Sequence, residues 1–161
     1  MKADYLNNRD IQHILALLTR SNELVFRVML ETGLRLGDVL AMKSELLHRD
    51  RFSVIEEKTG KRRRVRLRAE LREELLRVAG RLYIFPHRTN WMRHRTRQAV
   101  WKDVRRVASL VGVKVHASPH SARKNFAVEL FRECGDMERV KRELNHSDIG
   151  VTAIYALADT K

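Results

Sequence analysis

Three short segments near the carboxyl end carry residues suited to chemistry on a phosphodiester. They are His120-Ser121-Ala122-Arg123, Leu144-Asn145-His146 and Ala153-Ile154-Tyr155-Ala156. Far upstream, Thr32-Gly33-Leu34-Arg35 adds an arginine just after a glycine that ends a helix. An arginine can bind two phosphate oxygens at once, and an imidazole can transfer a proton near neutral pH. A tyrosine hydroxyl can hold a nucleic-acid strand end covalently, so the set predicts phosphate chemistry without a metal.

The spacing within these segments determines which side chains share a face. His120 and Arg123 lie on the same side of one helical turn, although a capping histidine beside a surface arginine explains that pair alone more simply. His146 and Tyr155 would lie on opposite sides of a single helix. Ser147 is a helix-capping residue type, so we expect His146 in the loop before a last helix and Tyr155 within that helix, facing the same site.

The commoner role of a tyrosine is that of a half-buried aromatic with its hydroxyl at the surface, and this alternative applies to Tyr155. The other two tyrosines are weaker nucleophile candidates. Tyr83 lies in an apolar segment, and Tyr5 lies close to the chain terminus. Tyr155 is therefore the predicted nucleophile.

Upstream charged residues extend this set. Asp38 is expected to orient Arg35 or to cap the next helix, and a surface ion pair is the alternative. Lys58 begins a basic segment at a predicted hairpin tip, where its ammonium group can donate a proton or form part of a solvated turn. We expect the cations that follow to contact a DNA backbone. The predicted DNA-contacting residues are Lys61, Arg62, Arg63, Arg64, Arg66, Arg88, Arg93, Arg95 and Arg97.

The second basic segment, residues 87–97, places Trp91 among arginines. It suits a DNA-backbone saddle and fits equally well a loop anchored by one tryptophan. His116 and His120 are four residues apart, but a zinc site needs a third ligand, and Pro119 interrupts the helix that would present them. We expect no metal and no cofactor.

Hydrophobic periodicity predicts a mainly helical chain with one small antiparallel sheet. A β-hairpin is expected over 52–67, around the turn signal Thr59-Gly60, and a brief buried strand or extended segment over 82–85. Ser21-Asn22 is expected to separate the first two helices. Helices are expected over 11–18 after a cap at Asn7-Asn8, then over 23–31, 37–43, 70–78, 95–111, 118–135, 136–144 and from 147 onward.

The composition is that of a globular domain, with 161 residues, 43% hydrophobic and 33% charged. The net charge is +13, and the whole excess lies in residues 51–161. Such a field favours nucleic acid as a partner over a membrane surface or an acidic protein. Apolar runs are too short to span a membrane, and Cys134 is the only cysteine. We expect no disulfide and a cytoplasmic location, associated with the nucleoid.

Taken in order, an arginine, a hairpin lysine, His-x-x-Arg, a second histidine and a tyrosine resemble the catalytic domain of tyrosine recombinases, the phage-integrase family. The resemblance covers the chain from about Tyr5 to Tyr155, and it rests on the ordered set because each motif alone is weak. It implies the catalytic fold shared with type IB topoisomerases, mainly α with a small antiparallel β-sheet (α+β).

The resemblance implies that DNA is cut and rejoined through a 3′-phosphotyrosyl link, without a metal or a high-energy cofactor. Tyr155 would be the nucleophile, while Arg35 and Arg123 would stabilise charge on the scissile phosphate. His146 would add a hydrogen bond to that phosphate.

Two further catalytic roles and one supporting role follow from the same resemblance. Lys58 would protonate the leaving 5′-oxygen, and His120 would act as acid and base beside the nucleophile. Asp38 matches an acidic position that supports the first arginine.

The chain departs from the family's pattern at Asn145, where glycine is usual, and at Lys124, where histidine is common; neither change removes a catalytic group. Residues 1–161 are expected to form a single catalytic domain without an amino-terminal core-binding domain, either as a fragment or as a small recombinase like the DNA invertases. The expected partners are double-stranded DNA and, on DNA, further copies of a chain that is monomeric in solution. Type IB topoisomerase activity and a non-catalytic basic DNA-binding module are the alternatives.

Overall fold

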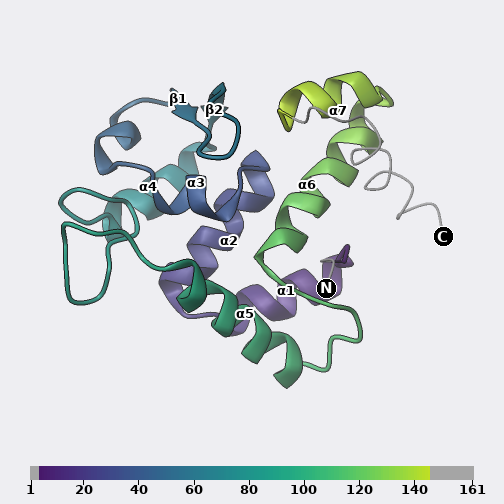
Figure 1. Cartoon of the computed structure of the whole chain (residues 1–161). Helices are drawn as coiled ribbons and strands as arrows, with labels where there is room; N and C mark the ends of the chain where they lie inside the picture. Colours follow the sequence, from purple (N-terminus) through teal and green to yellow (C-terminus); the bar gives the residue numbers. More distant parts are fainter. Residues whose placement is uncertain (1–3, 146–161) are drawn as a thin grey trace.

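The computed structural model describes residues 4–145, which fold mainly as helices with one two-stranded antiparallel sheet (Figure 1). The predicted fold class is confirmed. His146, Tyr155 and the helix expected from Ser147 lie outside the described residues. The elements are α1 Asn8–Leu17, α2 Arg20–Thr32, α3 Leu36–Leu40, the 3-10 helix η1 Ser44–His48, β1 Arg51–Ile55, β2 Arg62–Arg66, α4 Ala69–Val78, α5 Arg97–Leu110, α6 Pro119–Cys134 and α7 Met137–Glu143.

The first two helices begin at polar residues that play different roles. The Asn7 side chain accepts a hydrogen bond from the backbone N–H of Asp10 at 2.8 Å and caps α1 as predicted. The expected break at Ser21-Asn22 is wrong, because α2 already begins at Arg20. Asn22 is buried inside α2, and its amide donates to the Asp103 carboxylate of α5 at 2.7 Å. A residue type common in turns here serves as a buried contact between two helices.

The turn between α2 and α3 fixes where Arg35 emerges. Gly33 ends α2 with φ +64°, a left-handed conformation that favours glycine. A Cβ atom at Gly33 would lie 2.8 Å from Cγ of Phe126 in α6, so α6 packs against this turn without room for a side chain. Arg35 follows two residues later, immediately before α3.

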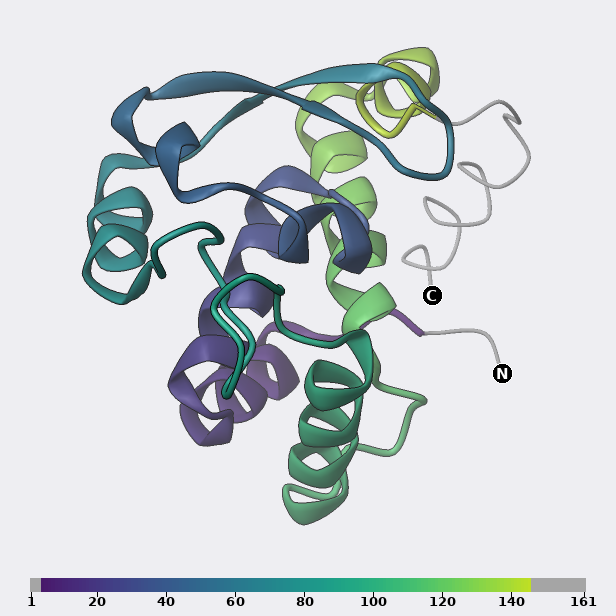
Figure 2. The same cartoon turned by 60° about the vertical axis from the view of Figure 1, so that its left-hand side comes forward.

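The β-hairpin alternates between buried and exposed residues. Phe52 pairs with Val65, and Val54 pairs with Arg63, and all four side chains are buried. The same alternation continues beyond β1 to Glu56, which is fully buried. Gly60 adopts φ +64° in the connecting turn. Figure 2 shows the hairpin extending across α3 and the nearby end of α2.

The segment between α4 and α5 is extended without forming a strand. Of the two forms expected over 82–85, the structure has the extended one, with a single antiparallel bridge between Lys43 and Tyr83. Ile84 and Phe85 are buried as predicted. Tyr83 is half-buried, and the Lys43 ammonium group lies 3.7 Å from its ring centroid.

The helices of the carboxyl half begin and end at the predicted signals. Ser118 and Pro119 open α6 with a reciprocal capping box that involves Ser121, and Gly135 ends it at φ +61°. Asp136 then caps α7 by accepting from two backbone N–H groups. α5 is shorter than predicted at both ends, since Thr96 caps it and it finishes at Leu110.

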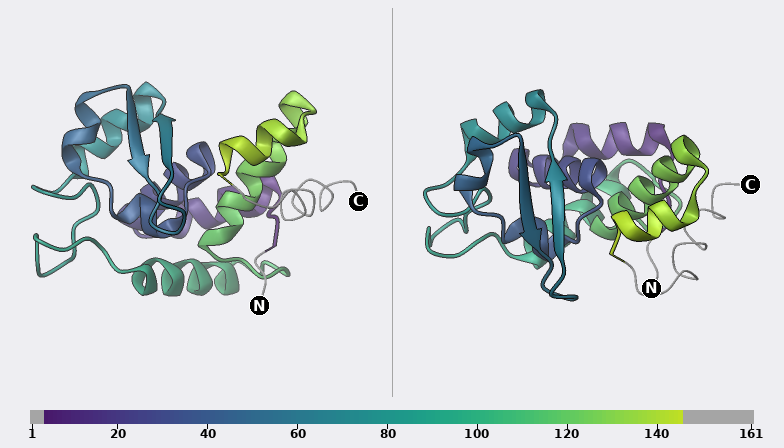
Figure 3. Two further views of the ribbon diagram at one scale, coloured as in Figure 1. Left: turned by 45° about the horizontal axis from the view of Figure 1, so that its top comes forward. Right: turned by 90° about the horizontal axis from the view of Figure 1, so that it is seen from above.

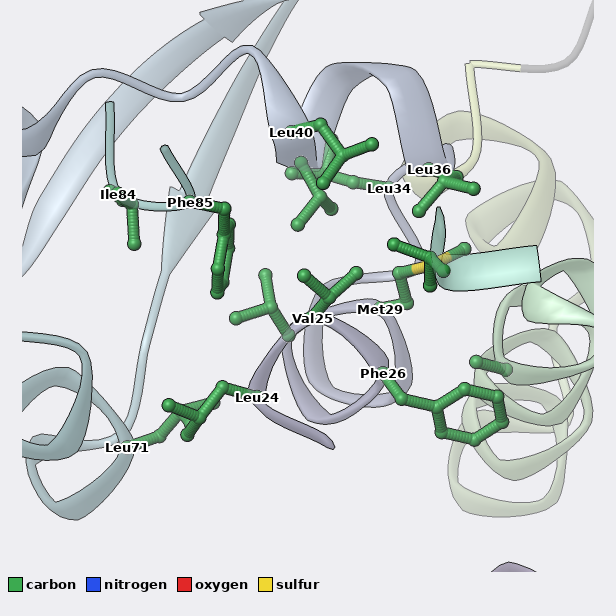
Figure 4. Packing of buried hydrophobic residues seen from close by; sticks show 14 of the residues in the cluster. Leu24, Val25, Phe26, Met29, Leu34, Leu36, Leu40, Leu71, Ile84 and Phe85 are labelled. Carbon is green, nitrogen blue, oxygen red and sulfur yellow. The ribbon is translucent and has the colours of Figure 1, made fainter. Parts of the chain in front are cut away.

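The hydrophobic core surrounds α2. Leu24, Val25, Phe26 and Met29 of this helix are fully buried and point toward neighbours on different sides (Figure 4). Figure 3 shows α6 and α7 on one side of α2, and the hairpin and α4 on the other. Because α2 contacts both groups, its carboxyl end is the place where they meet. No helix within the described range is long and apolar enough to cross a membrane.

Candidate active site

A pocket of about 800 Å³ opens where the α2–α3 turn, the hairpin and the amino ends of α5 and α6 come together. It gathers four of the predicted catalytic and supporting residues from three distant parts of the chain, namely Arg35, Asp38, Lys58 and His120. The remaining lining residues are Leu36, Gly37, Glu57, Arg97, Gln98, Trp101 and Lys102. Its lining is rich in cations beside an exposed tryptophan, a chemistry that suits a phosphate attached to a nucleoside.

Arg35 is fixed by a buried carboxylate. Its Nη1 donates to Oε2 of Glu56 at 2.7 Å, and Glu56 is fully buried while Arg35 keeps 21% of its side chain exposed. The Thr59 hydroxyl donates to the same oxygen at 3.0 Å. Burial raises the pKa of Glu56. The hydrogen bond and charge of Arg35 lower it, together with the hydrogen bond from Thr59, and these effects outweigh burial, so the pKa lies below its usual value. Glu56 is therefore an anion that holds the Arg35 guanidinium at the pocket.

Arg63 lies near the other carboxylate oxygen of Glu56 from the one that Arg35 binds, and it faces the interior. Its Nη1 is 3.6 Å from Oε1 of Glu56, and its Nη2 donates to the carbonyl of Thr32. Only 6% of this side chain is exposed, and its burial lowers the pKa of the guanidinium. Arg63 points inward like Val65 in the alternation of β2, unlike the exposed cations that were predicted to contact DNA with it.

Arg123 is buried behind the pocket. Its two terminal nitrogens donate to the carbonyl oxygens of Gly33 and Leu144, the latter at 2.8 Å. These bonds tie the end of α2 to the end of α7 through α6. The guanidinium therefore lies next to the turn that carries Arg35, while only 4% of the residue is exposed.

Asp38 is hydrogen-bonded to the hairpin segment. Its Oδ1 accepts from the backbone N–H of Glu57 at 2.9 Å, and its burial raises the pKa of its carboxyl group. The ion pair to Arg35 comes from Glu56, and the charge of Arg35 also acts on Asp38, so the support that Asp38 gives Arg35 stays a prediction. Asp38 also attaches α3 to the hairpin segment immediately before Lys58.

His120 and Lys58 both line the pocket with exposed side chains, from α6 and from the hairpin turn. Loss of hydration lowers the pKa of His120, and the nearby positive charges of Arg123 and Arg35 lower it further. The imidazole is accordingly neutral at pH 7 and able to accept a proton.

The whole described range matches a family of known sequences. The chain fits the sequence profile of the Phage integrase family over residues 4–161. The chain belongs to the phage integrase family. The resemblance found from the ordered residues is thereby confirmed.

Individual members of the phage integrase family are similar over most of this chain. Tyrosine recombinase XerD of Lacticaseibacillus casei is 30% identical over 144 residues, which cover 81% of this chain and 48% of that protein. The XerH site-specific recombinase in a post-cleavage complex with palindromic difH substrate superposes with a TM-score of 0.76 at 21% identity, over 98% of this chain and 50% of the other. The catalytic domain of bacteriophage HP1 integrase gives 0.70 at 21% identity, over 99% and 90%. These structures share the fold, and the chain spans about half the length of the curated relatives it matches.

Most of the other cations predicted to contact DNA are exposed in this phage integrase domain. Arg95 is an exception, because its Nε donates to the buried Asn22 at 2.6 Å and burial lowers its pKa. Arg95 is half-buried, and the DNA contact predicted for it stays a prediction. Arg97 is exposed but forms an ion pair with Glu57 across the pocket. The exposed set without such a pairing among the described contacts is Lys61, Arg62, Arg64, Arg66, Arg88 and Arg93.

Trp91 does not anchor the second basic segment in the core, since it is 49% exposed, with the Arg81 guanidinium 4.8 Å from its ring centroid. His116 accepts a hydrogen bond at Nδ1 from Arg105 at 2.9 Å, so the partner of this histidine is an arginine of α5. Within residues 4–145, no three His, Cys, Asp or Glu side chains are grouped so that they could hold a metal ion.

Sequence reasoning missed Glu56 and Glu57 as parts of the site. The signal for Glu56 was present, because it continues the inward alternation of Phe52 and Val54, and a buried glutamate requires a cationic partner. Trp101 and Lys102 were also missed, since α5 periodicity identifies only its buried face. They reach the pocket because α5 crosses beside α3.

Proposed function

We propose that this chain is the catalytic part of a site-specific recombinase that breaks and rejoins double-stranded DNA through a 3′-phosphotyrosyl link at Tyr155. The observation that carries the proposal is the convergence of Arg35, Lys58 and His120 on one pocket from the α2–α3 turn, the hairpin and α6. Family membership supports the same reaction class.

In the proposed reaction, the Tyr155 oxygen attacks phosphorus and the bond from phosphorus to the 5′-oxygen breaks. Neutral His120 takes the phenolic proton, and the Lys58 ammonium group gives a proton to the leaving 5′-oxygen. Reversal of these transfers, with a 5′-hydroxyl as the attacking group, rejoins the strand.

Charge on the five-coordinate phosphate is stabilised by cations that are already in place. Arg35 is held by Glu56 at the pocket, and Arg123 lies behind the same turn. We assign His146 a hydrogen bond to the same phosphate. Side chains supply the cations that other phosphodiester enzymes take from metal ions, so cleavage is expected to be unaffected by EDTA.

Exposed cations on the hairpin and on residues 87–94 are proposed to follow the DNA backbone. Binding should then weaken steeply with salt. The net charge of +13 makes copies of the chain repel each other in solution. We therefore propose that the free chain is a monomer and that copies assemble on DNA, where phosphates neutralise them; sedimentation with and without DNA measures this directly.

The test is covalent trapping on a DNA duplex that carries candidate core sites and a nick near the cleavage position. Cleavage releases a short strand that diffuses away, so the break cannot be rejoined and the covalent adduct accumulates. Wild-type protein should leave a protein–DNA band on a denaturing gel, with or without EDTA. Tyr155→Phe should bind the same DNA and leave no band, whereas the matched controls Tyr5→Phe and Tyr83→Phe should leave one.

Each alternative gives a different result in this assay. Binding without any covalent band indicates a DNA-binding module. Relaxation of a supercoiled plasmid that lacks the core site indicates a type IB topoisomerase. A band that persists in Tyr155→Phe contradicts the nucleophile assignment.

A further inference from the structure

The turn that carries Lys58 is attached to two helices through the residue before it. The backbone N–H of Glu57 donates to Oδ1 of Asp38 in α3 at 2.9 Å. The Glu57 carboxylate forms an ion pair with Arg97 at the start of α5. Both the backbone and the side chain of Glu57 are thus bonded to helices, and Lys58 is the next residue along the chain.

Gly37 explains why Arg97 can reach this position. A Cβ atom on Gly37 would lie 2.8 Å from Cζ and 2.8 Å from Nε of Arg97. The guanidinium therefore lies against the α3 backbone, in space that any side chain at residue 37 would fill. Gly37 does not adopt a left-handed conformation, so no backbone requirement accounts for the glycine.

The strength of this contact does not come from the ion pair alone. Glu57 and Arg97 are 72% and 58% exposed, and exposed pairs contribute little to stability. The packing on Gly37 restricts Arg97, and the adjacent, partly buried hydrogen bond to Asp38 restricts Glu57. Such a contact can orient a turn without contributing much to folding.

We propose that Arg97 is a positioning residue for Lys58, acting through Glu57, and does not serve as a DNA-backbone contact. This inference rests on the proposed function, in which Lys58 protonates the 5′-oxygen. With the Arg97–Glu57 pair intact, the turn presents the ammonium group to the pocket. Without it, Lys58 samples other positions and proton transfer slows.

The test compares cleavage of ordinary DNA with cleavage of a substrate whose leaving 5′-oxygen is replaced by sulfur, a leaving group that needs no proton. Arg97→Ala and Glu57→Ala should each slow cleavage of ordinary DNA roughly tenfold or more, a part of what a general acid contributes. Both should cleave the 5′-thio substrate at the wild-type rate. Arg77→Ala, which removes an exposed arginine paired with Glu73 in α4, is the matched control and should be normal on both substrates.

Gly37→Ala tests the same contact without changing any charge. Its Cβ displaces the flexible end of Arg97, while alanine favours helix formation over glycine by about 1 kcal/mol. The variant should melt no lower than the wild type, cleave ordinary DNA slowly and recover on the 5′-thio substrate. Lys58→Ala is run in parallel, because its rescue establishes that Lys58 is the acid.

The outcomes separate the two proposals. Rescue of Lys58→Ala but not of Arg97→Ala overturns the positioning role and leaves the proposed function in place. Failure to rescue Lys58→Ala overturns the acid assignment and, with it, this inference. If Arg97→Ala instead weakens DNA binding and lowers the salt slope by about 0.9, Arg97 is a phosphate contact.

Discussion

Three arginines packed around the carboxyl end of α2 and the arginines on the outer face of β2 carry the same charge in different surroundings. Arg35 and Arg63 share the buried carboxylate of Glu56, and Arg123 donates to two backbone carbonyls. The outer arginines of β2 alternate with buried residues and are exposed. The interior group is held in place before any ligand arrives, while the outer group can adjust its rotamers to a ligand.

This difference indicates how one basic domain divides its charge. Fixed cations need no reorganisation when negative charge develops on a phosphate, and they therefore stabilise the transition state more effectively. Mobile surface cations attract DNA from a distance and release counterions on binding, an effect that depends on salt and not on exact geometry. We expect substitutions in the two groups to affect different measurements.

The largest effect is expected for Glu56→Gln. The change leaves two largely buried guanidinium groups without their carboxylate, and breaking a buried pair typically removes about 3–5 kcal/mol from the free energy of unfolding. Chemical denaturation measures the loss. Glu73→Gln, at an exposed pair with Arg77, is the control and should change stability by less than about 0.5 kcal/mol. Equal stability of the two variants would contradict the idea that the interior arginines are held by Glu56.

Arg123→Ala is expected to have the next largest effect. It removes the donors to the carbonyls of Gly33 and Leu144, and unpaired buried acceptors typically cost about 1–3 kcal/mol. Denaturation should show a loss in that range, and covalent trapping should show no adduct even at temperatures where the variant is folded. An adduct formed at the wild-type rate would show that Arg123 has only a structural role.

Protonation of Glu74, which lies outside the pocket, is expected to have an intermediate effect on the free energy of unfolding. Hydrogen bonds from Arg27 and Arg20 lower the pKa of Glu74 from its usual 4.5 to about 2. Because the folded-state pKa is depressed, the stabilisation is complete above pH 4.5 and is lost as the pH falls toward 2. Solvent screening limits it to about 1 kcal/mol. Glu74→Gln should reduce stability at pH 7 and leave it nearly unchanged at pH 2, as followed by thermal unfolding.

The smallest effects on stability are expected on the outer face of β2. Single alanine substitutions of Arg62, Arg64 and Arg66 should each change the free energy of unfolding by less than about 0.5 kcal/mol. Each should lower the slope of log affinity against log salt by about 0.9 if it neutralises one phosphate. Arg63→Ala, from the same strand, should instead destabilise the fold. A salt slope unchanged in all three outer variants would place the DNA elsewhere.

Helix ends and the hairpin turn were predictable from the sequence because their causes are local. Gly33 and Gly135 end helices through their backbone conformation, and Ser118-Pro119 opens α6 through its own cap. The alternation that defines the hairpin also contained the information that Arg63 points inward with Val65. The count of positive charges obscured that signal.

The partners of the site residues were not predictable, because they depend on how distant elements pack. Asp38 is three residues from Arg35, yet the carboxylate that binds Arg35 is Glu56, which the hairpin brings over α3. Arg95 lies in a basic segment, yet it turns inward to Asn22 in α2. Spacing along the chain identifies which residue types are available, and tertiary packing decides which of them meet.

The division between fixed and mobile cations is tested most directly by measuring DNA affinity and covalent adduct formation together in Arg35→Lys and Arg64→Ala. Lysine keeps the charge beside Glu56 but cannot offer the bidentate fork of arginine. We predict that Arg35→Lys binds DNA as tightly as the wild type but forms adduct on the order of 10²-fold more slowly at saturating protein. Arg64→Ala should bind more weakly and form adduct at the wild-type rate once saturated. Equal losses of affinity and rate in both variants would contradict the account.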